Sequence, residues 1–163
     1  VESGHAAINW VISRDDQNLP IIIYGQSMGS IIALRTVIDK RMDMNLKLVV
    51  ADSAFDSFQQ IARHKLSQHW FTWPLQPLSY LLLSDHWAPT HLDTIAPTPV
   101  LVIHGQQDNV VEPQFGEAIY EKLAKPKSIW RIPNGTHTDV FWQHDKKYRA
   151  EFLNFLTQLD NNN

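Results

Sequence analysis

The sequence predicts an α/β fold in which helices cover a parallel sheet. Short apolar runs rich in β-branched residues alternate along the chain with segments that have helical periodicity. Continuous apolar runs are typical of strands that are buried on both faces, as they are in parallel sheets. The alternation of such strands with helices favours parallel pairing through crossover helices. The expected strands are residues 21–24, 46–51, 100–103 and 128–132.

Helices are expected before, between and after these strands. The spacing of apolar residues predicts them over about 3–13, 28–40, 56–66, 115–124 and 146–159. Asp56, followed three residues later by Gln59, predicts the N-cap pair of the third helix. Residues 1–159 are therefore expected to form a single domain, and residues 160–163 (DNNN) a disordered tail.

One stretch interrupts the alternation between the second and third expected strands. Residues 70–87 contain three of the six tryptophans, together with Pro74, Pro77 and a run of three leucines at 81–83. We expect a cap-like insert over about residues 67–92. Two compatible interpretations are an amphipathic insert that buries its apolar side on the body, and a lid that also lines a substrate pocket.

Composition excludes several classes of function. With 163 residues, a mass of 18.8 kDa and 44% hydrophobic residues, the chain can build one core. The formal net charge of -3 gives no electrostatic case for binding nucleic acid or an acidic membrane surface. The absence of cysteine excludes disulfides, thiolate catalysis and cysteine-ligated metal sites. No metal site is expected either, because the pairs His64/His69 and His86/His91 lack the i, i+4 spacing of two ligands on one helix face.

The sequence gives limited information on location. No apolar run is long enough to suggest a membrane span. The first residues, VESGHAAINW, lack the basic start and apolar run of a signal peptide, which favours the cytoplasm. The chain begins without Met, so a targeting segment could have preceded it and its native location stays open.

The stretch Gly25-Gln26-Ser27-Met28-Gly29 carries the strongest chemical signal. It matches G-x-S-x-G, directly follows an expected strand and directly precedes an expected helix, which is the context of a nucleophile elbow. Such a serine stands at a strained turn, and a Cβ at either flanking glycine is expected to collide with neighbouring backbone. The backbone N–H of Met28, at the helix N-terminus, is expected to donate to an oxyanion.

A serine hydroxyl needs a base to take its proton, and a histidine held by a carboxylate can serve. Asp108 and His137 each follow an expected strand, and Ser27, Asp108 and His137 occur in the chain order Ser–Asp–His. The carboxyl ends of parallel strands meet at one edge of a sheet, so we expect these three side chains to lie together. Asp52, directly after the second strand, is the alternative acid, and Asp139 is expected to be a carboxylate at a helix N-terminus.

From Ser3 to Leu159 the chain resembles the C-terminal part of an α/β-hydrolase. YGQSMGS resembles the nucleophile elbow, VLVIHGQQDNVV the acid loop and IPNGTHTDVF the histidine loop. Within that superfamily the chain is similar to compact serine esterases and peptidases of the dienelactone-hydrolase or prolyl-oligopeptidase type. It has a serine where true dienelactone hydrolases have a cysteine nucleophile.

This resemblance implies a partial α/β-hydrolase fold that lacks the strands normally found before the elbow strand. The second oxyanion donor, which normally comes from a loop in that region, would be absent as well. The elbow strand would be an edge strand with unpaired backbone groups. A homo-oligomer or a segment swap through this edge is therefore expected.

The expected function is that of a serine hydrolase cleaving a carboxylic ester or thioester through an acyl-enzyme on Ser27. His137 would act as base, Asp108 would orient it, and no cofactor is needed. The substrate would be a small molecule or an acyl compound, and the apolar insert favours a hydrophobic acyl part. The alternative is a non-catalytic α/β-hydrolase-fold fragment that acts in binding or assembly.

Overall fold

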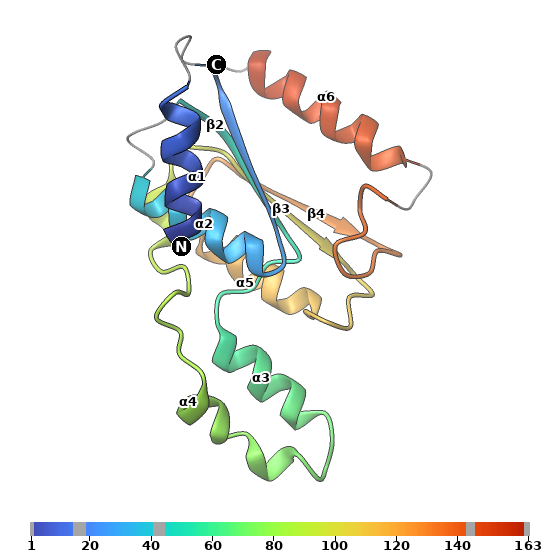
Figure 1. The fold of residues 1–163 in the computed structure, drawn as a ribbon. Coiled ribbons are helices and arrows are strands. Elements are labelled where there is room, and N and C mark those ends of the chain that lie inside the picture. The colour runs from blue at the N-terminus through green and yellow to red at the C-terminus, as the bar shows by residue number, and fades with distance from the viewer. Residues whose placement is uncertain (1, 15–18, 41–44, 143–145, 162–163) are drawn as a thin grey trace.

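A four-stranded parallel sheet forms the centre of the computed structural model, which describes residues 2–14, 19–40, 45–142 and 146–161 (Figure 1). The strands lie side by side in their order along the chain, β1-β2-β3-β4. They are β1 (Ile21–Gln26), β2 (Leu46–Asp52), β3 (Val100–Gly105) and β4 (Lys127–Ile132). The sheet confirms the predicted α/β class with parallel pairing.

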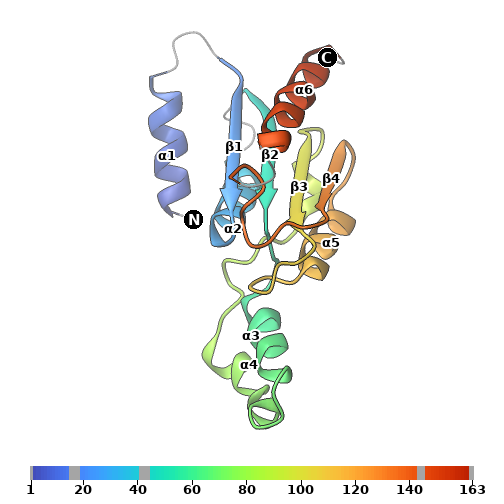
Figure 2. The same cartoon turned by 90° about the vertical axis from the view of Figure 1, so that its right-hand side faces the viewer.

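Helices cover both faces of the sheet. A group of helices lies on one side of the sheet and the C-terminal helix lies on the other (Figures 1 and 2). The first group is α1 (Glu2–Ile12), α2 (Met28–Lys40) and α5 (Pro113–Lys122), and the opposite helix is α6 (Lys147–Asn161). The segments predicted from helical periodicity therefore form helices, with boundaries that differ by up to two residues.

Alternate side chains of the central strands supply a hydrophobic core on each face. On one face the strands pack against α2 and α5, through buried residues that include Leu34, Val37, Val49, Val102 and Ile119. On the other face they pack against α6, through Leu48, Val50, Leu101, Ile103, Phe152 and Phe155. Burial on both sides explains why these strands are continuous apolar runs.

The elbow strand β1 is at the edge of the sheet. Among the described residues it pairs with β2 alone. Its side chains Ile22 and Tyr24 are each 38% exposed, whereas all six residues of β3 are buried. The predicted edge position is confirmed, and association through this edge stays a prediction.

The insert protrudes beyond the carboxyl ends of the strands (Figures 1 and 2). We call residues 58–87 the cap; it contains α3 (Phe58–Ser67), η2 (Trp73–Leu75) and α4 (Leu78–Leu82), and η3 (Leu92–Ile95) follows it. Helix α3 connects the cap to the body: Phe58 and Ile61 contact a cluster that includes Phe115, and Lys65 and Gln68 donate to Glu112. Most large apolar side chains farther along the cap face solvent, which differs from the expectation that they are buried on the body.

The N-cap of α3 is Ser57, so the prediction that Asp56 caps this helix is wrong. The Ser57 side chain accepts a hydrogen bond from the Gln60 N–H at 3.0 Å, and Asp85 Oδ1 accepts from the Phe58 N–H at 2.7 Å. Asp56 instead forms an ion pair with Lys122 of α5. A long-range charge partner thus draws Asp56 away from the helix end that local spacing assigned to it.

The end of the chain also differs from the prediction of a disordered tail. Asp160 and Asn161 continue α6, and Asp160 Oδ1 lies 2.5 Å from Lys47 Nζ. This ion pair joins the end of the helix to β2. Residues 162 and 163 lie outside the described residues. No helix in the described ranges is long and apolar enough to cross a membrane.

Candidate active site

Ser27 occupies the sharp turn between β1 and α2. Its φ of 52° lies in the left-handed region, which costs a non-glycine residue conformational energy. A Cβ on Gly25 would lie 2.4 Å from the Gly29 carbonyl oxygen, so only glycine fits before the turn. The structure therefore shows the strained strand-to-helix geometry that the motif predicts.

The neighbouring strand β2 holds this turn in place. The Ser27 N–H donates to the Asp52 carbonyl at 2.8 Å. The buried Ser30 hydroxyl lies 2.8 Å from the Gly25 carbonyl and 2.9 Å from the Asp52 carbonyl, and donates to this pair. Ser30 was not singled out from the sequence, although it directly follows the G-x-S-x-G motif.

The helix that follows Ser27 begins at Met28. The first N–H groups of a helix have no acceptor within the helix, so the Met28 N–H is available to an oxygen outside it. The positive end of the helix dipole lies at the same place. The position fits the predicted role of this N–H as an oxyanion donor.

One part of the steric argument for the motif is wrong. A Cβ built on Gly29 has no heavy atom within 4 Å, so this glycine is not required by crowding from the described residues. β1 is an edge strand, and no further strand of the described chain lies against the elbow.

Asp108 and His137 form a direct acid–base pair. His137 Nδ1 lies 2.8 Å from Asp108 Oδ2, and the two residues come from the loops after β4 and β3. The Asp108 side chain is fully buried, whereas that of His137 is 22% exposed. The ring is thus held through Nδ1 by a carboxylate inside the protein.

The second oxygen of Asp108 fixes the orientation of the carboxylate. Asp108 Oδ1 accepts hydrogen bonds from the N–H groups of Val110 and Val111, both at 2.9 Å. His104 lies behind it, with Nε2 2.9 Å from the Val111 carbonyl and 3.6 Å from Asp108 Oδ2. The buried His104 ring therefore supports the acid loop.

Two glycines allow the acid loop and the histidine loop to touch. A Cβ on Gly105, at the end of β3, would lie 2.4 Å from the carbonyl oxygens of both Gly135 and Thr136. A Cβ on Gly135 would lie 2.8 Å from the Ile132 side chain. Sequence analysis assigned no role to these glycines, because the contact joins segments about thirty residues apart.

The histidine loop also reaches the elbow. The Thr138 N–H donates to Ser53 Oγ at 3.1 Å, and Gln26 Nε2 lies 3.4 Å from the Thr138 carbonyl. These contacts bring the residue after His137 beside the residue before Ser27. Among the described residues, no hydrogen bond joins Ser27 Oγ to the His137 ring.

Asp139 stabilises the histidine loop instead of a helix N-terminus. Its Oδ2 accepts hydrogen bonds from the Thr136 N–H at 2.9 Å and the Thr136 hydroxyl at 2.7 Å. Residue 139 lies between two turns, and α6, the next α-helix of the described residues, begins at Lys147. The helix expectation for Asp139 is therefore wrong, since its carboxylate closes a turn around His137.

Asp52, the alternative acid, binds other partners. Its Oδ2 accepts from the Tyr24 hydroxyl at 2.6 Å and from Gln26 Nε2 at 3.2 Å, and its Oδ1 accepts from Ser53 Oγ at 3.2 Å. Burial raises the pKa of Asp52, and these hydrogen bonds offset part of the effect. Burial and the adjacent Asp52 carboxylate also raise the pKa of Tyr24. The geometry places Asp108, not Asp52, against His137.

A cavity of about 470 Å³ borders the elbow on the α6 side of the sheet. It lies beside Gln26, the residue before Ser27, and its walls are mainly aromatic and aliphatic. The lining residues are Tyr24, Gln26, Phe141, Trp142, Arg149, Phe152 and Leu153.

Comparison with known proteins identifies the fold. No family model matches the chain. It is 30% identical over 158 residues to the uncharacterized protein YfhR of Escherichia coli, covering 96% of this chain and 52% of that protein. It is 27% identical over 168 residues to the α/β hydrolase domain-containing protein WAV2 of Arabidopsis thaliana, covering 96% and 53%.

The Pyrococcus furiosus esterase Pf2001 superposes with a TM-score of 0.65 and 18% identity, covering 94% of this chain and 59% of that structure. The chain thus has the α/β-hydrolase fold of known esterases. It spans about half the length of the curated relatives that it matches.

Proposed function

We propose that this chain carries the catalytic residues of a serine hydrolase that cleaves carboxylic esters or thioesters. The observation that carries the proposal is the hydrogen bond of 2.8 Å between His137 and the buried Asp108, on the same sheet edge as the strained Ser27. The fold is that of esterases such as Pf2001. The apolar cavity beside Gln26 supports a substrate with a hydrophobic part.

In the proposed reaction, Ser27 Oγ attacks the ester carbonyl carbon while His137 Nε2 takes the hydroxyl proton. The Met28 N–H stabilises the negative charge that develops on the carbonyl oxygen. Asp108 keeps the proton of His137 on Nδ1, so that Nε2 is free to accept, and stabilises the imidazolium. The tetrahedral intermediate then expels the alcohol or thiol, which receives the proton from His137.

Water completes the cycle. His137 Nε2 removes a proton from a water molecule as that water attacks the acyl carbon on Ser27. Collapse of the second intermediate releases the carboxylic acid and returns the proton to Ser27 Oγ. The Met28 N–H is the one oxyanion donor that we identify among the described residues. A site with this donor alone is expected to turn over slowly, because one missing donor typically costs about 10²–10³ in rate.

A second candidate is a non-catalytic module that acts in binding or assembly. Two observations favour it: the open edge of β1, and the absence, among the described residues, of a hydrogen bond between Ser27 and His137. The difference between the two candidates lies in whether Ser27 becomes a nucleophile.

Hydrolysis of p-nitrophenyl esters with acyl chains of increasing length tests the proposal. The chain is expected to release p-nitrophenol, and Ser27→Ala and His137→Ala are each expected to reduce release to the background rate. Circular dichroism establishes that each variant is folded. Hydrolysis that persists in a folded Ser27→Ala variant contradicts the proposed nucleophile.

A further inference from the structure

The tip of the cap exposes an unusual concentration of large apolar side chains. Trp70 is 87% exposed, Leu81 79% and Leu82 71%. They belong to a group that we call the cap tip: Trp70, Phe71, Trp73, Leu75, Leu78, Leu81 and Leu82, all of them exposed. Soluble proteins rarely expose a contiguous apolar patch of this kind unless it contacts a partner or a lipid surface.

Within the cap, the charged side chains that precede Asp85 are basic, and the carboxylates of Asp85 and Glu112 contact α3 from outside that stretch. Between Ser57 and Ser84 the sequence has Arg63 and Lys65 and no aspartate or glutamate, although the whole chain has a net charge of -3. Lys65 Nζ lies 2.6 Å from Glu112 Oε1, so its charge is paired. Arg63 has neutral partners instead, Gln76 Oε1 at 3.3 Å from Nε and the Tyr80 hydroxyl at 3.0 Å from Nη1.

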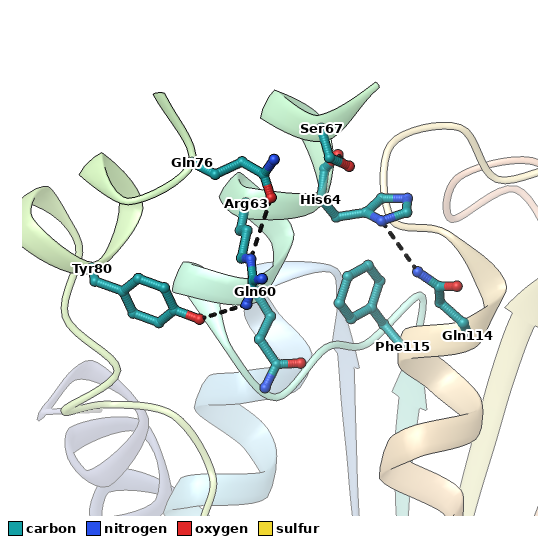
Figure 3. A pocket seen from close by; sticks show the side chains of 8 residues that line it. All are labelled: Gln60, Arg63, His64, Ser67, Gln76, Tyr80, Gln114 and Phe115. Atoms are coloured by element: carbon teal, nitrogen blue, oxygen red, sulfur yellow. Dashed lines mark hydrogen bonds between the residues drawn. The ribbon is translucent and has the colours of Figure 1, made fainter. Parts of the chain in front are cut away.

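Arg63 lies in a polar pocket of about 330 Å³ between α3, α4 and α5 (Figure 3). Gln60, His64, Ser67, Gln76 and Gln114 also line it, with Phe115 at its side. Figure 3 shows Gln76 and Tyr80, from the cap, held to the Arg63 guanidinium. The Arg63 guanidinium has no carboxylate partner among the described residues, and a pocket with such a group and several amide donors can receive a phosphate group.

We propose that the cap docks on an anionic phospholipid bilayer. The cap tip would enter the boundary between headgroups and acyl chains, where tryptophan and leucine are favoured. The pocket around Arg63 would receive a lipid phosphate, since Arg63 of α3 is hydrogen-bonded to Gln76 and Tyr80, which lie among the cap-tip residues. The cap stands at the carboxyl edge of the sheet, so docking would bring the Ser27 edge toward the lipid (Figure 2). This inference needs no catalysis by Ser27.

Vesicle co-sedimentation of the 163-residue chain tests the proposal. The probes are vesicles of phosphatidylcholine alone and of phosphatidylcholine mixed equally with phosphatidylglycerol. The chain is expected to sediment with both and more tightly with the anionic vesicles. Its tryptophan emission is expected to shift to shorter wavelength and to be quenched by brominated acyl chains, and free inorganic phosphate at millimolar levels is expected to leave it bound.

Three variants separate the contributions. The double variant Trp70→Ser/Leu81→Ser is expected to bind both kinds of vesicle at least about tenfold more weakly, because it removes two inserted side chains. Arg63→Gln is expected to weaken binding on both kinds of vesicle, because both lipids carry a phosphate, and more strongly on the anionic vesicles, by roughly fivefold. The matched control is Trp10→Ala, which removes a tryptophan that is 58% exposed on α1, outside the cap. It is expected to bind as the wild type does.

Two outcomes overturn the proposal. One is a wild-type chain that does not sediment with either vesicle, or a folded double variant that binds as well as the wild type. The other is a wild-type dimer in light scattering that the double variant loses while vesicles bind neither protein, because the cap tip would then be an interface between copies. A Ser27→Ala variant is expected to bind vesicles normally, so failure of docking and failure of catalysis can be told apart.

Discussion

Replacement of Asp108 by asparagine should inactivate the site through the tautomer of His137, with little change in structure. Asp108 Oδ1 accepts hydrogen bonds from two backbone N–H groups, those of Val110 and Val111. In Asp108→Asn, the two backbone N–H groups need an acceptor, so the amide oxygen takes the position of Oδ1 beside them. The amide NH₂ group then takes the position of Oδ2, 2.8 Å from His137 Nδ1. An NH₂ group cannot accept from an Nδ1–H.

The His137 ring in this variant is therefore expected to carry its proton on Nε2. That nitrogen can then no longer remove the proton of Ser27. Loss of the correct tautomer in a Ser–His–Asp site typically costs about 10⁴ in rate, or about 5 kcal/mol of transition-state stabilisation. Asp52→Asn is the matched control, since Asp52 is also a buried strand-end carboxylate but binds Tyr24, Gln26 and Ser53. We expect it to retain activity within about tenfold of wild type.

The assay is the second-order rate constant for inactivation by a fluorophosphonate, measured beside ester hydrolysis. Both asparagine variants should have the wild-type circular dichroism spectrum. An inactive Asp52→Asn beside an active Asp108→Asn would refute the reasoning and make Asp52 the acid. Equal losses of activity in the two asparagine variants would show that neither carboxylate acts only by fixing the tautomer of His137.

Three further predictions concern stability, measured by denaturant or thermal unfolding. Gly25→Ala should lower the free energy of unfolding by about 1–3 kcal/mol, because the added Cβ would overlap backbone atoms. Gly29→Ala should leave it unchanged or raise it by up to about 1 kcal/mol, because the added Cβ meets open space in a helix. Equal effects of the two substitutions would contradict the steric account. Gly116→Ala should cost about 1–3 kcal/mol, because its Cβ would overlap Nδ1 of the buried His104, and an unchanged midpoint would argue against that contact. Burial raises the pKa of Asp52 in the folded state above its ordinary value of 3.8. The protonated carboxyl therefore stabilises the folded state below that pH, and this contribution is lost as the pH rises through the folded-state pKa. The stability of Asp52→Asn relative to wild type should accordingly be greater near neutrality than near pH 3.8, and a difference that does not depend on pH would contradict this.

Local patterns predicted the elements that build the site. The apolar spacing predicted a helix over 28–40, which is also the extent of α2. The short run at 100–103 predicted a buried strand, and β3 extends it to Gly105. The chain order of Ser27, Asp108 and His137 was sufficient to place them at one edge, since parallel strands bring their carboxyl ends together.

Features that depend on contacts between distant segments were not predictable in this way. Asp56 matched a capping pattern, but its ion pair with Lys122 lies across 66 positions of the chain. The approach of Gly105 to Gly135 depends on how the acid loop and the histidine loop pack against each other. The exposure of the cap tip was not predictable either, because an apolar run has the same sequence pattern whether the body of the protein covers it or leaves it exposed to solvent.

The central claim is that Ser27 is an activated nucleophile, and covalent labelling tests it most directly. The chain would be treated with a fluorophosphonate, and its intact mass and peptide map compared before and after. The account predicts a single adduct on Ser27 that is lost in Ser27→Ala and in His137→Ala. An unlabelled but folded wild-type chain, or an adduct that survives in Ser27→Ala, would contradict it.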